Sequence, residues 1–131
     1  MREAIRAIPD GVYQSEIWNN PLGTFERHPL KLTVAGDEIH LDFTGAPPQL
    51  QQGGLNCTLN YTAAHATYPL KCLLTPNVRG NAGCYRPFTV SAPEGSAADY
   101  GCVVGGDGRI DHAASEARRR EVRAGLAQAA E

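Results

Sequence analysis

Two runs of alternating apolar and polar residues, separated by a short turn, constrain the fold of this chain most strongly. Each run places an apolar residue at every second position, and the residues concerned are Leu30, Leu32, Val34, Ile39, Leu41 and Phe43. The four residues between the runs, Ala-Gly-Asp-Glu at 35–38, are typical of a tight turn. Because successive side chains of a strand point to opposite faces, the pattern predicts an antiparallel β-hairpin over residues 30–43 with one apolar face.

The polar residues of the second run then share the opposite face of the hairpin. His40 and Asp42 stand two residues apart, so their side chains lie on one side of the strand and close together. An imidazole and a carboxylate in that arrangement can act as an acid/base pair. The alternative is that both are simply solvated, as polar residues on an outer sheet face usually are.

The rest of the chain reads as short elements joined by irregular segments. We expect a helical segment over 1–8, strands over 11–18, 88–90 and 100–104, a helix over 60–74, and a C-terminal helix beyond Asp111. Pro69 falls inside the 60–74 helix and removes one backbone hydrogen bond there. We therefore expect that helix to be broken near Tyr68.

Glycine and proline are frequent, with 14 and 9 residues among 131, which predicts many turns. The predicted fold class is α+β, mostly β with long irregular loops, containing an antiparallel hairpin, one broken helix and a C-terminal helix. The length allows about one domain of ordinary size.

Charge and hydropathy exclude several classes of protein. The formal net charge of −2 gives no basic surface for nucleic acid. No apolar run approaches the ~20 residues of a membrane span, and the first residues lack the apolar centre of a signal peptide. The expected location is therefore the cytoplasm, where the four cysteines are expected to be thiols.

Several motifs, in order and spacing, carry a family resemblance. They are Asp42-Phe43-Thr44-Gly45, Asn56-Cys57, Leu70-Lys71-Cys72-Leu73-Leu74, Asn81-Ala82-Gly83-Cys84-Tyr85-Arg86-Pro87 and Ala92-Pro93-Glu94-Gly95-Ser96. Together they resemble the hydantoinase B/oxoprolinase family, of the 5-oxoprolinase and N-methylhydantoinase B type. Residues 1–96 correspond to a partial domain of that kind.

The tail resembles the same family at its extreme C-terminus. The matching stretches are Asp99-Tyr100-Gly101-Cys102-Val103-Val104 and Asp107-Gly108-Arg109-Ile110-Asp111, followed by an alanine-rich segment. Residues 97–131 are accordingly expected to be a C-terminal strand and helix. Members of this family carry a large glycine-rich region between the two parts. The chain therefore resembles a truncated or internally deleted member, with the junction at 96–99.

The resemblance implies an ATP-dependent hydrolase that opens cyclic amides such as 5-oxoproline or a hydantoin. The chain shows no ATP-binding motif, so no cofactor is expected in it. ATP would be handled by a hydantoinase A-like partner protein or domain, and a metal requirement stays open. The alternative is a non-catalytic remnant, or a small assembly or interaction module of such a complex.

Cys84 and Arg86 form the remaining candidate site. A guanidinium beside a thiol lowers the pKa of the thiol and makes it nucleophilic. The alternative is a buried structural thiol, with Arg86 anchoring its loop. A metal site built from Cys57, His65, Cys72 and Cys84 lacks any closely spaced ligand pair and is disfavoured.

An incomplete family body also predicts exposed apolar surface, which favours association. The residues expected to contribute to it are Trp18, Leu55, Leu59 and Tyr61.

Overall fold

The computed structural model describes residues 1–20, 23, 25–49 and 56–100. The chain divides into two units, Met1–Tyr100 and Gly101–Glu131. The predicted strand over 100–104, apart from Tyr100, and the predicted C-terminal helix lie outside the described residues.

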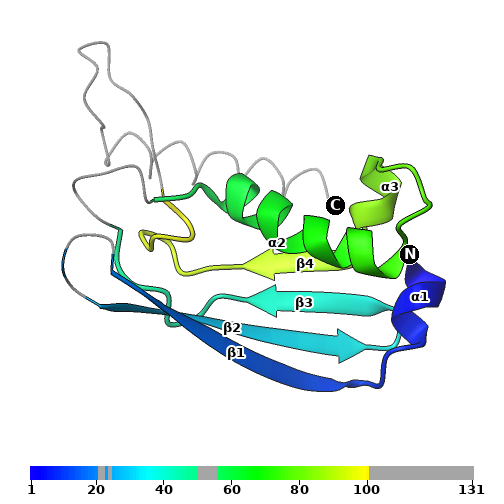
Figure 1. The fold of residues 1–131 in the computed structure, drawn as a ribbon, viewed down its shortest axis with the longest axis horizontal. Coiled ribbons are helices and arrows are strands. Elements are labelled where there is room, and N and C mark those ends of the chain that lie inside the picture. Colours follow the sequence, from blue (N-terminus) through cyan, green and yellow to red (C-terminus); the bar gives the residue numbers. More distant parts are fainter. Residues whose placement is uncertain (21–22, 24, 50–55, 101–131) are drawn as a thin grey trace, which may run out of the picture. The chain divides into compact units, whose positions relative to one another are not determined.

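A four-stranded sheet organises the first unit, with the strands in chain order (Figure 1). The strands are β1 (Gly11–Asn19), β2 (Glu26–Ala35), β3 (Glu38–Asp42) and β4 (Phe88–Ser91). β1, β2 and β3 are antiparallel neighbours, whereas β4 runs parallel to β3. The predicted hairpin is thus confirmed as β2 and β3, with Gly36 at φ 60° in the turn. The α+β class is confirmed as well.

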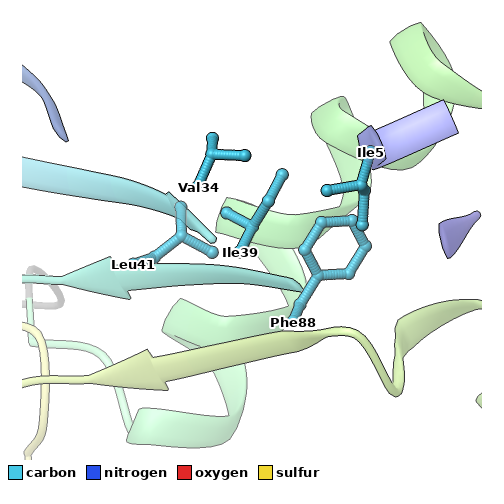
Figure 2. Packing of buried hydrophobic residues seen from close by; sticks show 5 residues of the cluster. All are labelled: Ile5, Val34, Ile39, Leu41 and Phe88. Carbon is cyan, nitrogen blue, oxygen red and sulfur yellow. The ribbon is translucent and has the colours of Figure 1, made fainter. Parts of the chain in front are cut away.

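The core lies on the face of the hairpin that the alternation predicts. Val34, Ile39 and Leu41 are at most 2% exposed, and Phe88 of β4 packs beside them. Figure 2 shows these side chains clustered with Ile5, which reaches in from helix α1 (Arg2–Arg6). The core is therefore small and depends on a few aliphatic side chains.

Two arginines hold α1 against the hairpin turn. Arg2 Nη1 and Arg6 Nη2 each lie 2.6 Å from a different carboxylate oxygen of Asp37. Asp37 lies in the turn between β2 and β3, so the two ion pairs place Ile5 over the end of the core.

Helix α2 (Leu59–Leu74) packs its apolar side onto the same core. It begins after Thr58, whose side chain accepts from the Tyr61 backbone N–H. The predicted break near Tyr68 is wrong, because α2 continues through Pro69 to Leu74. Leu70 and Leu74, beyond the proline, pack against the core, and this packing offsets the backbone hydrogen bond that proline removes.

A short helix that the sequence did not predict lies in the stretch before β4. Helix α3 (Ala82–Tyr85) begins after Asn81, whose side-chain oxygen accepts from the Cys84 backbone N–H at 3.2 Å. Its four residues are too few to give a helical pattern of apolar positions.

Among the described residues, no helix is long and apolar enough to cross a membrane.

The segment before Gly101 is tied to two distant parts of the chain. The Tyr100 N–H donates to the Cys57 carbonyl at 2.7 Å, and the Ala97 N–H donates to the Pro47 carbonyl at 2.9 Å. Tyr100 itself is 8% exposed. Residues 97–100 therefore pack against the rest of the first unit. The internal deletion at 96–99 stays a prediction.

The predicted exposed apolar residues are largely as expected. Trp18 and Tyr61 are 60% and 54% exposed, whereas Leu59 is half-buried. Leu55 lies outside the described residues.

Candidate functional site on the open face of the sheet

The face of the sheet opposite the core carries a row of polar side chains. His40 stands opposite Thr33 of β2 and Thr89 of β4 in the strand register. Residues directly opposite one another point to the same face. His40 and Asp42 therefore lie away from the core residues Ile39 and Leu41, as the sequence predicts. We call this surface the open face.

His40 lies between two hydroxyl groups on the open face. Its Nδ1 is 2.8 Å from Thr89 Oγ1, and its Nε2 is 3.1 Å from Ser91 Oγ. The Ser91 hydroxyl also lies 3.5 Å from Asp42 Oδ1, to which it can donate. Ser91 thus links the imidazole to the carboxylate, and the structure brings together the two residues proposed from sequence.

The state of this link depends on the protonation of His40. When the imidazole is charged, both ring nitrogens donate, and Ser91 accepts from Nε2 while it donates to Asp42. When Nε2 carries no proton, the Ser91 hydroxyl can donate to it instead. Reorientation of one hydroxyl therefore accompanies a change of charge on the imidazole.

Asp42 is held as an anion by its neighbours. Lys31 Nζ lies 2.8 Å from Asp42 Oδ2, and Thr44 donates its hydroxyl at 2.6 Å and its backbone N–H at 2.9 Å to Oδ1. The hydrogen bond from Lys31, followed by those from Thr44, holds the pKa of Asp42 far below its usual range. Asp42 is consequently a fixed negative charge at neutral pH.

We expect Asp42→Asn to lower the free energy of unfolding by about 1–2 kcal/mol at pH 7, because Lys31 loses its charged partner and Thr44 a charged acceptor. The folded-state pKa of Asp42 is depressed, so its contribution is full above the unfolded pKa of about 4 and fades as pH falls below that value. Urea unfolding at pH 7 and pH 3 measures the effect. The difference between wild type and variant should shrink at the lower pH, and a difference that grows there contradicts this assignment.

A second ion pair borders a cavity next to Asp42. Arg27 Nε lies 2.6 Å from Glu16 Oε2. The cavity has a volume of about 450 Å³, and Gln14, Lys31 and Thr44 are among the residues that line it. The open face therefore offers charges of both signs beside a space for a small polar molecule.

Cys84 has the environment of a structural thiol. It is 8% exposed, and its Sγ donates to the Arg79 carbonyl at 3.4 Å. Arg86 is exposed at the end of α3. This geometry favours the structural interpretation of Cys84 over the nucleophilic one.

The residues considered as metal ligands do not converge in the described structure. No group of three or more His, Cys, Asp or Glu side chains suited to a metal ion occurs in the residues with described positions. Cys72 is exposed whereas Cys84 is buried, and His65 stacks on Tyr61 with ring centroids 4.2 Å apart.

Thiol modification tests the assignment of Cys84. We expect a maleimide reagent to modify Cys72 rapidly in the folded chain, because that side chain is exposed. Modification of Cys84 should require unfolding. Peptide mass spectrometry before and after addition of urea distinguishes the two positions, and equally fast modification of Cys84 in the folded chain contradicts its burial.

The sequence alone did not identify several members of this site. Ser91, Thr89 and Lys31 join it through the register of three strands. The alternation of Phe88 and Val90 with Thr89 and Ser91 was the available signal, but a strand of four residues does not show which neighbour it pairs with.

Comparison with known proteins places this fold in a family. A family model described as hydantoinase B/oxoprolinase matches residues 1–102. 5-Oxoprolinase 1 of Arabidopsis thaliana is 36% identical over 83 residues, which are 60% of this chain and 6% of that protein. A putative D-/L-hydantoinase B protein of Pseudomonas sp. (strain NS671) is 31% identical over 109 residues, which are 73% of this chain and 18% of that protein.

A solved structure agrees with these matches. The crystal structure of an ATP-dependent caprolactamase from Pseudomonas jessenii has a TM-score of 0.59 and 25% sequence identity, covering 75% of this chain and 17% of that chain. This chain thus spans less than a fifth of the length of each of these three relatives. The family model covers the residues that form the sheet, α2 and the open face, and the chain belongs to the hydantoinase B/oxoprolinase family.

Proposed function

We propose that this chain is a fragment or short member of an ATP-dependent cyclic-amide hydrolase, which opens a ring such as 5-oxoproline or a hydantoin together with an ATP-binding partner. The observation that carries this proposal is a hydrogen-bonded network on the open face of a family member, in which Ser91 links His40 to Asp42. The names of the relatives, an oxoprolinase, a hydantoinase B protein and an ATP-dependent caprolactamase, support this substrate class.

The chemistry divides naturally between two components. A ring amide is a poor electrophile. Transfer of the γ-phosphoryl group of ATP to its oxygen makes the carbonyl carbon susceptible to attack by water. Water then adds to that carbon, and the C–N bond breaks as the ring nitrogen takes up a proton, which leaves an acyl phosphate. A second water hydrolyses the acyl phosphate and releases phosphate and the ring-opened carboxylic acid. We assign the phosphoryl transfer to a hydantoinase A-like partner, because no ATP-binding motif occurs in this sequence.

The open face would serve the hydrolytic half of this reaction. In the neutral imidazole Nδ1 donates to Thr89 and Nε2 accepts from the Ser91 hydroxyl. The proton of the attacking water would reach His40 through Ser91, whose hydroxyl gives its own proton to Nε2 and takes one from the water. The anionic Asp42 stabilises the imidazolium that results, acting through Ser91. The carbonyl and amide groups of the ring would find donors and acceptors in the adjacent polar cavity.

The second candidate is a non-catalytic remnant, or a small assembly or interaction module of such a complex. Strand β1 favours it, since every one of its residues after Gly11 is exposed. In this alternative the chain binds other proteins of the complex, and the open face takes no part in chemistry.

ATP hydrolysis that depends on 5-oxoproline or a hydantoin separates the two candidates. We expect the isolated chain to be inactive, because it lacks an ATP-binding motif, and we expect turnover when a cognate ATP-binding partner is added. Stable complex formation without turnover supports the interaction module instead. Turnover by the isolated chain contradicts both the remnant and the need for a partner.

A further inference from the structure

Strand β1 carries large apolar side chains on both of its faces, and all of them are exposed. Val12 and Trp18 stand opposite Thr33 and Arg27 in the register and so lie on the open face. Tyr13 and Ile17 lie on the other face, and Ile17 is 66% exposed. Apolar residues on both faces of a strand are typical of a sheet whose two faces are covered. In the described structure β1 is one of the two edge strands, and both of its faces are exposed.

The edge of β1 also lacks the features that prevent natural edge strands from pairing with strands of other chains. Such strands usually carry a bulge, a proline or an outward lysine. β1 pairs with β2 over nine consecutive residues with no bulge, and its sequence contains neither proline nor lysine. Its one charged residue, Glu16, is already paired with Arg27. The outer edge of β1 is therefore suited to accept another strand.

We infer that this strand is β1 of a second copy of the chain, paired antiparallel about a twofold axis at Ser15. Ser15 is the central residue of Gly11–Asn19. Pairing about it places Tyr13 opposite Ile17 of the other copy on one face. On the other face it places Val12 opposite Trp18.

Each of these cross-strand pairs joins an aromatic ring to a β-branched side chain, a combination that stabilises antiparallel sheets. Gln14 meets Glu16 of the other copy, and its amide N–H can donate to that carboxylate. A shift of register by one residue in either direction would place an apolar side chain, Ile17 or Tyr13, opposite a polar one and lose this match. The sequence of β1 is thus complementary to itself in one register.

The proposed pairing forms a closed dimer. It joins two four-stranded sheets into one continuous sheet, and a twofold axis perpendicular to that sheet leaves both open faces on the same side. His40 and Ser91 lie on β3 and β4, away from the new junction. The dimer is therefore independent of the proposed hydrolase function, and either can fail without the other.

Sedimentation equilibrium of the full chain tests the dimer. We expect dimers at tens of micromolar that dissociate on dilution, because pairing along one strand gives a small interface. Ile17→Lys should yield a monomer at the same concentration, since a lysine on each strand would replace the apolar contact. Leu73→Lys is the matched control, because Leu73 is 78% exposed on α2 and lies outside β1. Circular dichroism establishes that each variant is folded.

A cross-link tests the register. Ser15→Cys should form a disulfide between the two copies at position 15 on mild oxidation, because directly opposite residues lie within disulfide distance. Gln14→Cys should not link to itself, whereas the double variant Gln14→Cys/Glu16→Cys should. Peptide mass spectrometry separates these links from those of the native cysteines. Three results would overturn the proposal. The wild type could stay monomeric at about 100 μM, well above the range expected for a small interface. The dimer could persist in Ile17→Lys, or Ser15→Cys could form no link at position 15.

Discussion

Replacement of Leu41 by alanine should remove a large part of the stability of the first unit. Leu41 is 2% exposed in the central part of the sheet and contacts a core formed by few residues. A leucine-to-alanine change in a core costs about 2–5 kcal/mol, through lost burial and the cavity that remains. Domains of this size have about 5–15 kcal/mol in total. The variant should therefore unfold at a much lower urea concentration, or be unfolded in buffer.

Leu73→Ala is the control for this measurement. Leu73 is also a leucine but is 78% exposed on α2, so its truncation should change the free energy of unfolding by no more than about 0.5 kcal/mol. Urea unfolding followed by circular dichroism compares the two variants with wild type. Equal losses for Leu41→Ala and Leu73→Ala would mean that the described core does not determine stability.

The strands could be predicted because local pattern and tertiary burial agree in them. The alternation from Leu30 to Phe43 specifies both the hairpin and its buried face, and the turn residues specify the register. The place of His40 and Asp42 on one polar face follows from the same alternation. No long-range information is needed for either conclusion.

Helix α2 shows where local rules are insufficient. Pro69 predicts a break from backbone chemistry alone, yet the residues on both sides of it pack against the same sheet. Tertiary packing outweighs the local cost of the proline. The extent of that packing follows only from the positions of β4 and the hairpin, which the local sequence of α2 does not give. The short helix α3 was missed for the opposite reason, since it depends on one cap, Asn81, and has almost no pattern of its own.

Only part of the candidate site could be predicted from the sequence. His40 and Asp42 are neighbours in the chain, but Ser91 is 51 residues from His40. Their contact depends on the parallel pairing of β3 with β4, which brings Asp42 opposite Ser91. Parallel pairing between distant segments has no local signature comparable to a hairpin turn.

Loss of the imidazole should have the largest effect on the proposed reaction. His40→Gln keeps a side chain that can hydrogen-bond Ser91 or Thr89 but cannot exchange a proton near neutral pH. General acid or base catalysis contributes roughly 10²–10⁴-fold to rates. We expect kcat to fall by that factor with little change in KM, because His40 acts on the water through Ser91 and the cavity that receives the ring is unchanged. His65→Gln is the matched control, since His65 is an exposed histidine on α2.

The most direct test measures formation of the ring-opened carboxylic acid from 5-oxoproline and from a hydantoin, with ATP and a cognate ATP-binding partner present. Wild type and His65→Gln should give the product at similar rates, and His40→Gln should give roughly 10²–10⁴-fold less. All three proteins should bind the partner equally well. Absence of product with wild type, or a rate for His40→Gln equal to that of wild type, would contradict a hydrolytic site on the open face.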